Sequence, residues 1–138
     1  MNTRFSVATH VLAFLQTQKG RPVSSEMLAS SVNTNASLIR RLLLQLAKAG
    51  LTKSQMGTGG GALLARDGRS ISLLDVFRAV EDQELLAVHN TSAPQCPVGR
   101  HIEGVLRRRV KVAENAMAAE LASVSIAEIA DEVGAKRR

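Results

Sequence analysis

The segment between residues 22 and 65 constrains the fold more than any other part of the chain. It reads PVSSEMLASSVNTNASLIRRLLLQLAKAGLTKSQMGTGGGALLA. Apolar residues recur at three- and four-residue steps on both sides of a short polar turn, which predicts two successive helices. A glycine stop and a glycine-rich hairpin follow directly. This order of elements is that of a winged helix-turn-helix, so we expect a mostly α fold with a small β-hairpin wing.

The first helix of this pair follows Pro22 and Val23. Ser24 or Ser25 is its expected N-cap, and the carboxylate of Glu26 suits the positive end of the helix dipole. Asparagine tolerates left-handed backbone and caps helices, so residues 33–35, Asn-Thr-Asn, form the turn. Three apolar residues are expected to face inward: Met27, Leu28 and Val32.

The second helix is expected from about residue 36 to 49, and the N-terminal half of such a helix is exposed in a helix-turn-helix. Ser37, Arg40 and Arg41 lie there, where guanidinium groups can reach guanine O6 and N7 or phosphates in a major groove. Ser25 and Asn35 would position phosphates. An ordinary solvated helix face is the alternative for the two arginines. The apolar stripe expected to be buried comprises Leu38, Ile39, Leu42, Leu43 and Leu46.

The glycine-rich stretch is interpreted as a wing, with strands at 51–56 and 62–65 and a tip at 57–61. Gly59 and Gly60 allow close backbone approach to a phosphate chain, with Lys53 and Thr58 as nearby donors. The tip also satisfies the G-x-G-x-x-G/A dinucleotide fingerprint. That motif requires a helix that begins at the glycines. Only four weakly apolar residues follow here, so the context argues against a dinucleotide-binding loop.

Positive charge is concentrated in the half that contains this segment. Residues 1–66 hold eight lysines and arginines and one acid, a balance of +7, whereas the rest of the chain has a balance of −1 within a total of +6. Such an asymmetry indicates a polyanionic partner met by one face. Ordinary solvated basic side chains are the alternative.

Helices are also expected on both sides of the winged segment. The first runs from Thr3 to about Gln18, and a later one opens at the N-cap Ser72 and runs to about Asp82. We therefore expect a DNA-binding domain at 1–82 and a linker or sensor segment at 83–96. Residues 97–138 would form a long dimerisation helix, a short helix from 126 to 133, and a frayed basic tail from 135 to 138.

The long helix is expected between residues 97 and 123, and at ~1.5 Å per residue it would measure roughly 40 Å. One copy of so small a body cannot cover a stripe of that length, so a second copy is the simplest partner. The chain is therefore expected to form a homodimer. The stripe comprises Ile102, Leu106, Val110, Ala113, Met117 and Leu121.

Cys96 is the one cysteine of the chain and directly precedes Pro97, a residue suited to the first helical position. A thiol at this N-cap would feel the positive end of the helix, which favours a reactive thiolate. A redox or electrophile switch is one interpretation, and a small, partly buried hydrophobe is the other. A metal site made with His89 and His101 is a weaker alternative.

Several classes of protein are excluded by composition and pattern. The apolar runs are far shorter than the ~18 residues of a membrane span, and the N-terminus lacks a signal-peptide cleavage site, so a cytoplasmic protein is expected. One cysteine allows no intramolecular disulfide. The sequence shows no paired carboxylates, no activated nucleophile and no metal motif. We therefore do not expect an enzyme.

These features together resemble the Rrf-two (BadM-like) family of bacterial winged-helix transcriptional regulators. The resemblance rests on the helix-turn-helix, Ala49-Gly50-Leu51, the glycine wing, SLLDVFRAVE from Ser72 and the long helix before SIAEI, and it covers nearly the whole chain. It implies a homodimer that places two recognition helices and two wings on a roughly palindromic DNA operator.

The chain departs from the family pattern at two places. Iron-sulfur members carry three closely spaced cysteines before the long helix, whereas this chain has only Cys96, so a cluster-free branch without a cofactor is implied. Many members also have a basic residue before the first wing glycine, where this chain has Met56. We therefore expect a DNA-binding repressor that reads sequence mainly through Arg40 and Arg41. A winged-helix module that binds another protein, without specific DNA binding, is the alternative.

Overall fold

The computed structural model describes residues 2–82 and 84–136. Its helices are α1 (Arg4–Thr17), α2 (Ser25–Val32), α3 (Ala36–Lys48), the 3-10 turn η1 (Gly68–Ser70), α4 (Leu73–Val80), α5 (Pro97–Ala122) and α6 (Ile126–Lys136). Strands β1 (Thr52–Gln55) and β2 (Gly61–Leu64) form one antiparallel hairpin. The predicted mostly helical fold with a hairpin wing is confirmed.

The described residues divide into two compact units. Residues 2–81 and 121–136 form one, which we call the winged body, and residues 82 and 84–120 form the other, the long-helix unit. α6 extends three residues beyond its predicted end and takes up Ala135 and Lys136. Arg137 and Arg138 of the predicted basic tail lie outside the described residues.

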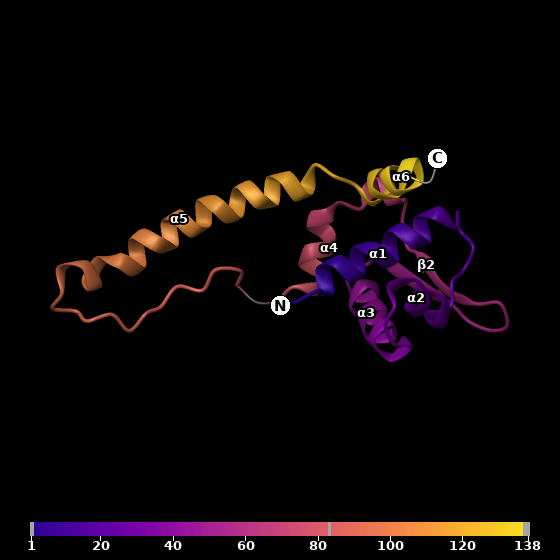
Figure 1. Ribbon diagram of the computed structural model, residues 1–138, viewed down its shortest axis with the longest axis horizontal. Coiled ribbons are helices and arrows are strands. Elements are labelled where there is room, and N and C mark those ends of the chain that lie inside the picture. Colours follow the sequence, from indigo (N-terminus) through magenta and orange to yellow (C-terminus); the bar gives the residue numbers. More distant parts are fainter. Residues whose placement is uncertain (1, 83, 137–138) are drawn as a thin grey trace. The chain divides into compact units, whose positions relative to one another are not determined.

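α1 is the central helix of the winged body. It contacts α2, α3, α4, α6 and β2, and Figure 1 shows it between α6 on one side and α2 and α3 on the other. Ala8, Val11, Leu12 and Leu15 are buried along it at helical spacing, so its apolar positions face neighbours on two sides. Two core clusters therefore form against a single helix.

The first cluster joins α1 to α3, α4 and the start of α6, and the second joins α1 to α2, α3 and the wing. Leu12, Leu46 and Ile126 are fully buried in the first, and Leu28 and Ile39 in the second. Burial of each such side chain stabilises the fold by about 1.5–3 kcal/mol. Helix α3 contributes to both clusters, which fixes its position in the body.

Met27 departs from the prediction, because the structure leaves it 56% exposed. The inward face of the short helix α2 is formed by Leu28 and Ala29, both buried. Successive helical residues are separated by about 100°, so Met27 falls outside the arc that these two residues define.

The wing is attached to the segment before α2 as well as to its own partner strand. Val23 forms an antiparallel bridge with Ala62, with N···O distances of 3.0 and 2.8 Å. A Cβ atom on Gly61 would lie 2.4 Å from the carbonyl oxygen of Val23, so only glycine allows this approach. The sequence pattern does not reveal this second pairing of β2.

The C-terminal segment returns to the winged body through backbone hydrogen bonds. Leu73 N–H donates to the carbonyl of Val124 at 2.9 Å, and Ile126 N–H donates to that of Ile71 at 2.8 Å. Ser72 caps α4 in a complete capping box with Asp75, as predicted. The starts of α4 and α6 are thereby joined.

α5, in the long-helix unit, has no buried residue. The predicted stripe is half-buried except for Ala113, which is exposed, and Val98, Val105 and Val112 add 68%, 41% and 65% exposed side chains. No α5 residue is thus covered as a core residue by the described part of this chain.

Candidate nucleic-acid interface

The turn between α2 and α3 is built by capping side chains. Ser24 is the N-cap of α2, where its Oγ accepts from Met27 N–H at 3.1 Å, and Asn33 ends that helix in the left-handed region with φ 65°. Asn35 then caps α3, because its Oδ1 accepts from Leu38 N–H at 2.8 Å. The side-chain oxygen of Asn35 is used for this cap, and the NH2 group of the same amide can still donate to a phosphate.

The exposed side of α3 carries the predicted reading residues. Ser37, Arg40 and Arg41 are exposed, whereas Ile39 and Leu42 are buried on the opposite side. Arg40 forms an ion pair with Glu26 of α2 at 2.5 Å, and both side chains remain more than half exposed. Glu26 is the acid of the basic half and sits against a predicted DNA-reading arginine.

Ser25, Arg40 and Lys53 lie around one hollow of about 220 Å³ between α2, α3 and the wing. Lys53 projects from β1 and is exposed. Leu44 and Ser54 line the same hollow, and the side chain of Leu44 on α3 is 60% exposed although it is apolar. The sequence pattern singled out neither of these two residues as part of the interface.

Arg41 lies on the other flank of α3. It lines a second hollow, of about 360 Å³, together with Thr3, Arg4 and Leu38. Within residues 2–82 and 84–136, neither Arg41 nor Lys53 has an ion-pair partner. No acid of the described residues therefore competes with a phosphate for these two side chains through an ion pair.

The tip of the wing holds the remaining predicted residues. Thr58 and Gly59 are exposed, and Gly59 has φ 77° with open space where a Cβ would lie. A Cβ on Gly60 would lie 2.1 Å from the carbonyl oxygen of Gln55, so this glycine is needed to close the hairpin. Met56, directly before the first glycine of the wing, is 87% exposed.

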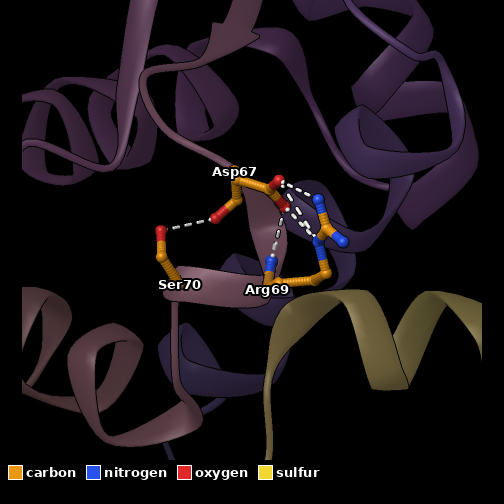
Figure 2. Close-up of polar contacts among 3 residues, drawn as sticks. All are labelled: Asp67, Arg69 and Ser70. Atoms are coloured by element: carbon orange, nitrogen blue, oxygen red, sulfur yellow. Dashed lines mark hydrogen bonds and ion pairs between the residues drawn. The ribbon is translucent and has the colours of Figure 1, made fainter.

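Two arginines that follow the wing, Arg66 and Arg69, form ion pairs with neighbouring acids. Figure 2 shows the ion pair between Asp67 and Arg69, whose shortest N···O distance is 2.8 Å. Ser70 Oγ donates a hydrogen bond to the backbone carbonyl of Asp67. Hydrogen bonds from Arg69 lower the pKa of Asp67 to about 2. Arg66 pairs with Asp75 at 3.0 Å. Arg66 and Arg69 are therefore less available to a DNA phosphate than Arg41 and Lys53, which have no ion-pair partner among the described residues.

Cys96 is exposed and directly precedes the first residue of α5. Hydrogen bonds from the backbone N–H groups of Gly99 and Val98 lower the pKa of its thiol below the usual value. The thiol therefore sits where the orphan donors of a helix N-terminus stabilise a thiolate.

The comparisons with known proteins agree with this geometry. The sequence model of Rrf2, described as an iron-dependent transcriptional regulator, matches residues 1–132. The chain belongs to the Rrf2 family of transcriptional regulators. It is therefore a helix-turn-helix DNA-binding regulator and not an enzyme.

Two kinds of relative support this assignment. YwnA of Bacillus subtilis (strain 168), named as a candidate HTH-type transcriptional regulator, is 42% identical over 130 residues, covering 94% of this chain and 96% of YwnA. A crystal structure of a candidate DNA-binding protein is 37% identical, with a TM-score of 0.73, over 91% of this chain and 97% of that one. A candidate transcriptional regulator from Lactobacillus plantarum reaches a TM-score of 0.80 at 25% identity, over 97% and 91% of the two chains.

The residues present do not fit the iron cofactor that the family description implies. The chain has a single cysteine, and no group of three His, Cys, Asp or Glu side chains with metal-binding geometry occurs among the described residues. Thiolate ligation of an iron-sulfur cluster ordinarily requires several cysteines.

In the described part of the chain, no helix is both long and apolar enough to cross a membrane.

Proposed function

We propose that this Rrf2 protein is a homodimeric repressor of the cluster-free branch, acting in the cytoplasm on a roughly palindromic double-stranded DNA operator. The observation that carries the proposal is the grouping of Ser25, Arg40 and Lys53 around one hollow where recognition helix and wing meet. Arg41 stands on the adjacent flank of the same helix. This arrangement combines a major-groove reader with a phosphate clamp.

The residues have different roles in this proposal. Arg40 and Arg41 read guanine or clamp the groove, Ser25, Asn35 and Ser37 position phosphates, and Lys53, Thr58, Gly59 and Gly60 bring the wing to the backbone. Residues 1–82 are the proposed DNA-binding domain and 83–96 the sensor segment. Packing of α6 on α1 supports counting the last helix with the winged body, so that α5 is the dimerisation element.

Electrophoretic shifts on the region upstream of the protein's own gene, across a salt series, test the proposal. Arg41→Ala is expected to cost about 1–3 kcal/mol of binding and to relax specificity at one position of each half-site. Lys53→Ala is expected to weaken all sequences almost equally and to flatten the salt dependence.

Lys136→Ala is a matched control, because it removes one positive charge from the exposed end of α6. If operator affinity falls equally for Arg41→Ala and Lys136→Ala, the loss is explained by the lower net charge and not by a specific contact of Arg41. Absent or salt-insensitive binding would contradict the proposal and favour the protein-binding alternative.

We also propose that Cys96 makes the repressor responsive to peroxide or electrophiles. The supporting observations are its exposure and the two backbone N–H groups directed at its thiol. In the peroxide step the thiolate sulfur attacks one oxygen, the O–O bond breaks, and the released hydroxide takes a proton, leaving a sulfenic acid and water.

Operator binding before and after peroxide treatment tests this switch. We expect weaker binding by the treated wild type and no change for Cys96→Ser. Identical curves for treated and untreated wild type would reject it.

A further inference from the structure

A larger hollow, of about 620 Å³, lies on the winged body between α1, α2 and α6. It shares no lining residue with the two hollows beside α3. Its volume falls within the roughly 300–1,000 Å³ of small-molecule sites. Nothing in the DNA-reading arrangement requires it.

Three hydroxyl groups of this hollow can only accept a hydrogen bond from a ligand, and the side-chain amide of Gln18 can both donate and accept. Ser6, Thr9 and Thr17 donate their hydroxyl protons to carbonyls of α1 or its N-cap, at 3.0, 2.9 and 2.6 Å. Each hydroxyl oxygen therefore has only lone pairs to offer a ligand. The lining contains no lysine, arginine, aspartate or glutamate, so it does not select a charged molecule.

The remaining wall is apolar. Phe14 and Ile129 are half-buried, Ala13 and Ala130 are 8% and 7% exposed, and Val133 is 55% exposed at the side of α6. An apolar wall with a few convergent polar groups is the usual composition of a ligand pocket.

We propose that this hollow binds a neutral, amphipathic small molecule with an apolar ring and at least one N–H or O–H donor, and that its occupancy changes operator affinity. The first part stands on the lining alone. The second rests on the proposed function.

The position of the hollow can couple ligand binding to operator binding. His10 Nε2 lies 2.8 Å from Ser31 Oγ, a hydrogen bond between α1 and the last turn of α2. α2 ends two residues later at Asn33, whose left-handed backbone leads into the recognition helix. A molecule in contact with α1, α2 and α6 therefore touches the first helix of the helix-turn-helix, and a different fit in the DNA-competent state would change operator affinity.

Binding of indole and benzofuran to the DNA-free protein, followed by amide chemical shifts, tests the pocket. The two probes have nearly the same shape, and only indole has an N–H donor. We expect saturable shifts at Ser6, Thr9, Ser31 and Val133, with indole bound about threefold to tenfold more tightly. Equal affinity, shifts elsewhere in the body, or no saturable shift at millimolar probe would overturn the proposal.

Two variants separate pocket chemistry from folding. Thr9→Val combined with Thr17→Val keeps the volume and removes two acceptors, so it should abolish the preference for indole while benzofuran still binds. Ala13→Met fills the hollow and should exclude both probes. If circular dichroism shows that Ala13→Met is unfolded, the preference for indole over benzofuran in the double variant tests the pocket instead. A change in sedimentation of a folded Ala13→Met protein would identify the hollow as a contact between copies and overturn the small-molecule proposal.

Operator binding with and without saturating indole is measured separately. An unchanged affinity would overturn the regulatory half of the proposal. If the probe-free protein does not bind the operator, the proposed function fails. The chemical-shift experiment then still tests whether the hollow binds the probes.

Discussion

The ion pair between Glu26 and Arg40 sets the charge of the reading surface. Both side chains are exposed, and their N···O distance is 2.5 Å. An exposed pair of this kind stabilises the fold little. Its larger effect is on DNA binding, because Arg40 must exchange Glu26 for a base or phosphate and Glu26 stays near the phosphate chain.

We expect Glu26→Gln to tighten operator binding. The amide removes a negative charge close to phosphates and weakens the hold on Arg40, which should raise affinity by about 0.5–1.5 kcal/mol at low salt, with a smaller gain at high salt. Fluorescence anisotropy across a salt series measures it. Asp131→Asn, an exposed carboxylate on α6, is the control. Weaker binding by Glu26→Gln would show that Glu26 instead positions Arg40.

Asp67 gives the winged body a pH-dependent contribution to stability. Its pKa lies at about 2 in the folded chain, below the usual 3.8, so the stabilisation is present above the unfolded pKa and is lost as pH falls toward the folded one. The side chain of Asp67 is exposed to solvent, so the effect is small.

Asp67→Asn keeps an acceptor for the Arg69 N–H and removes the charge. We expect the variant to have a lower urea midpoint than the wild type at neutral pH, and the difference to shrink below about pH 4. Urea unfolding followed by circular dichroism measures both proteins. A difference that stays constant between about pH 5 and 3 would show that the charge of Asp67 is not its source.

At the scale of elements, the wing depends on two glycines for different reasons. Gly61 is required by the close approach of Val23, whereas Gly59 faces open space and only its φ of 77° opposes a side chain. We expect Gly61→Ala to cost about 2–4 kcal/mol in the free energy of unfolding, and Gly59→Ala only about 1 kcal/mol.

Urea denaturation of the two glycine variants checks this order. Operator affinity should fall for Gly61→Ala even under conditions where the variant is folded, because the wing loses its attachment to the segment before α2. Equal unfolding free energies for the two variants would mean that the bridge to Val23 does not hold the wing.

The features that could be predicted from the sequence are local ones. The capping box at Ser72, the turn at Asn33 and the exposed arginines of α3 are determined by residues within one or two helical turns. The bridge from Val23 to Ala62 and the pairing of Arg40 with Glu26 join segments that are distant in sequence, so no periodicity reveals them. The hollow between α1, α2 and α6 was missed for the same reason.

At the scale of the whole molecule, the winged body and the long helix have different needs. The body encloses two core clusters and is closed by the hydrogen bonds that join α4 to α6. α5 has an apolar stripe with no buried residue. The body can therefore remain folded when the stripe is changed, and a substitution on the stripe should act on assembly alone.

We expect Leu106→Asp to convert a dimer into a monomer, because a carboxylate buried between two apolar helices would be unpaired. Asn115→Asp is the matched control: nine residues, or two and a half turns, place it on the opposite face of α5, and it introduces the same charge. Sedimentation velocity should give a monomer only for Leu106→Asp, with the unfolding midpoint of the body unchanged. The monomer should lose at least about tenfold in operator affinity, because two linked half-site contacts become one. Dimeric Leu106→Asp, or an equal loss of dimer in both variants, would exclude this stripe as the contact between copies.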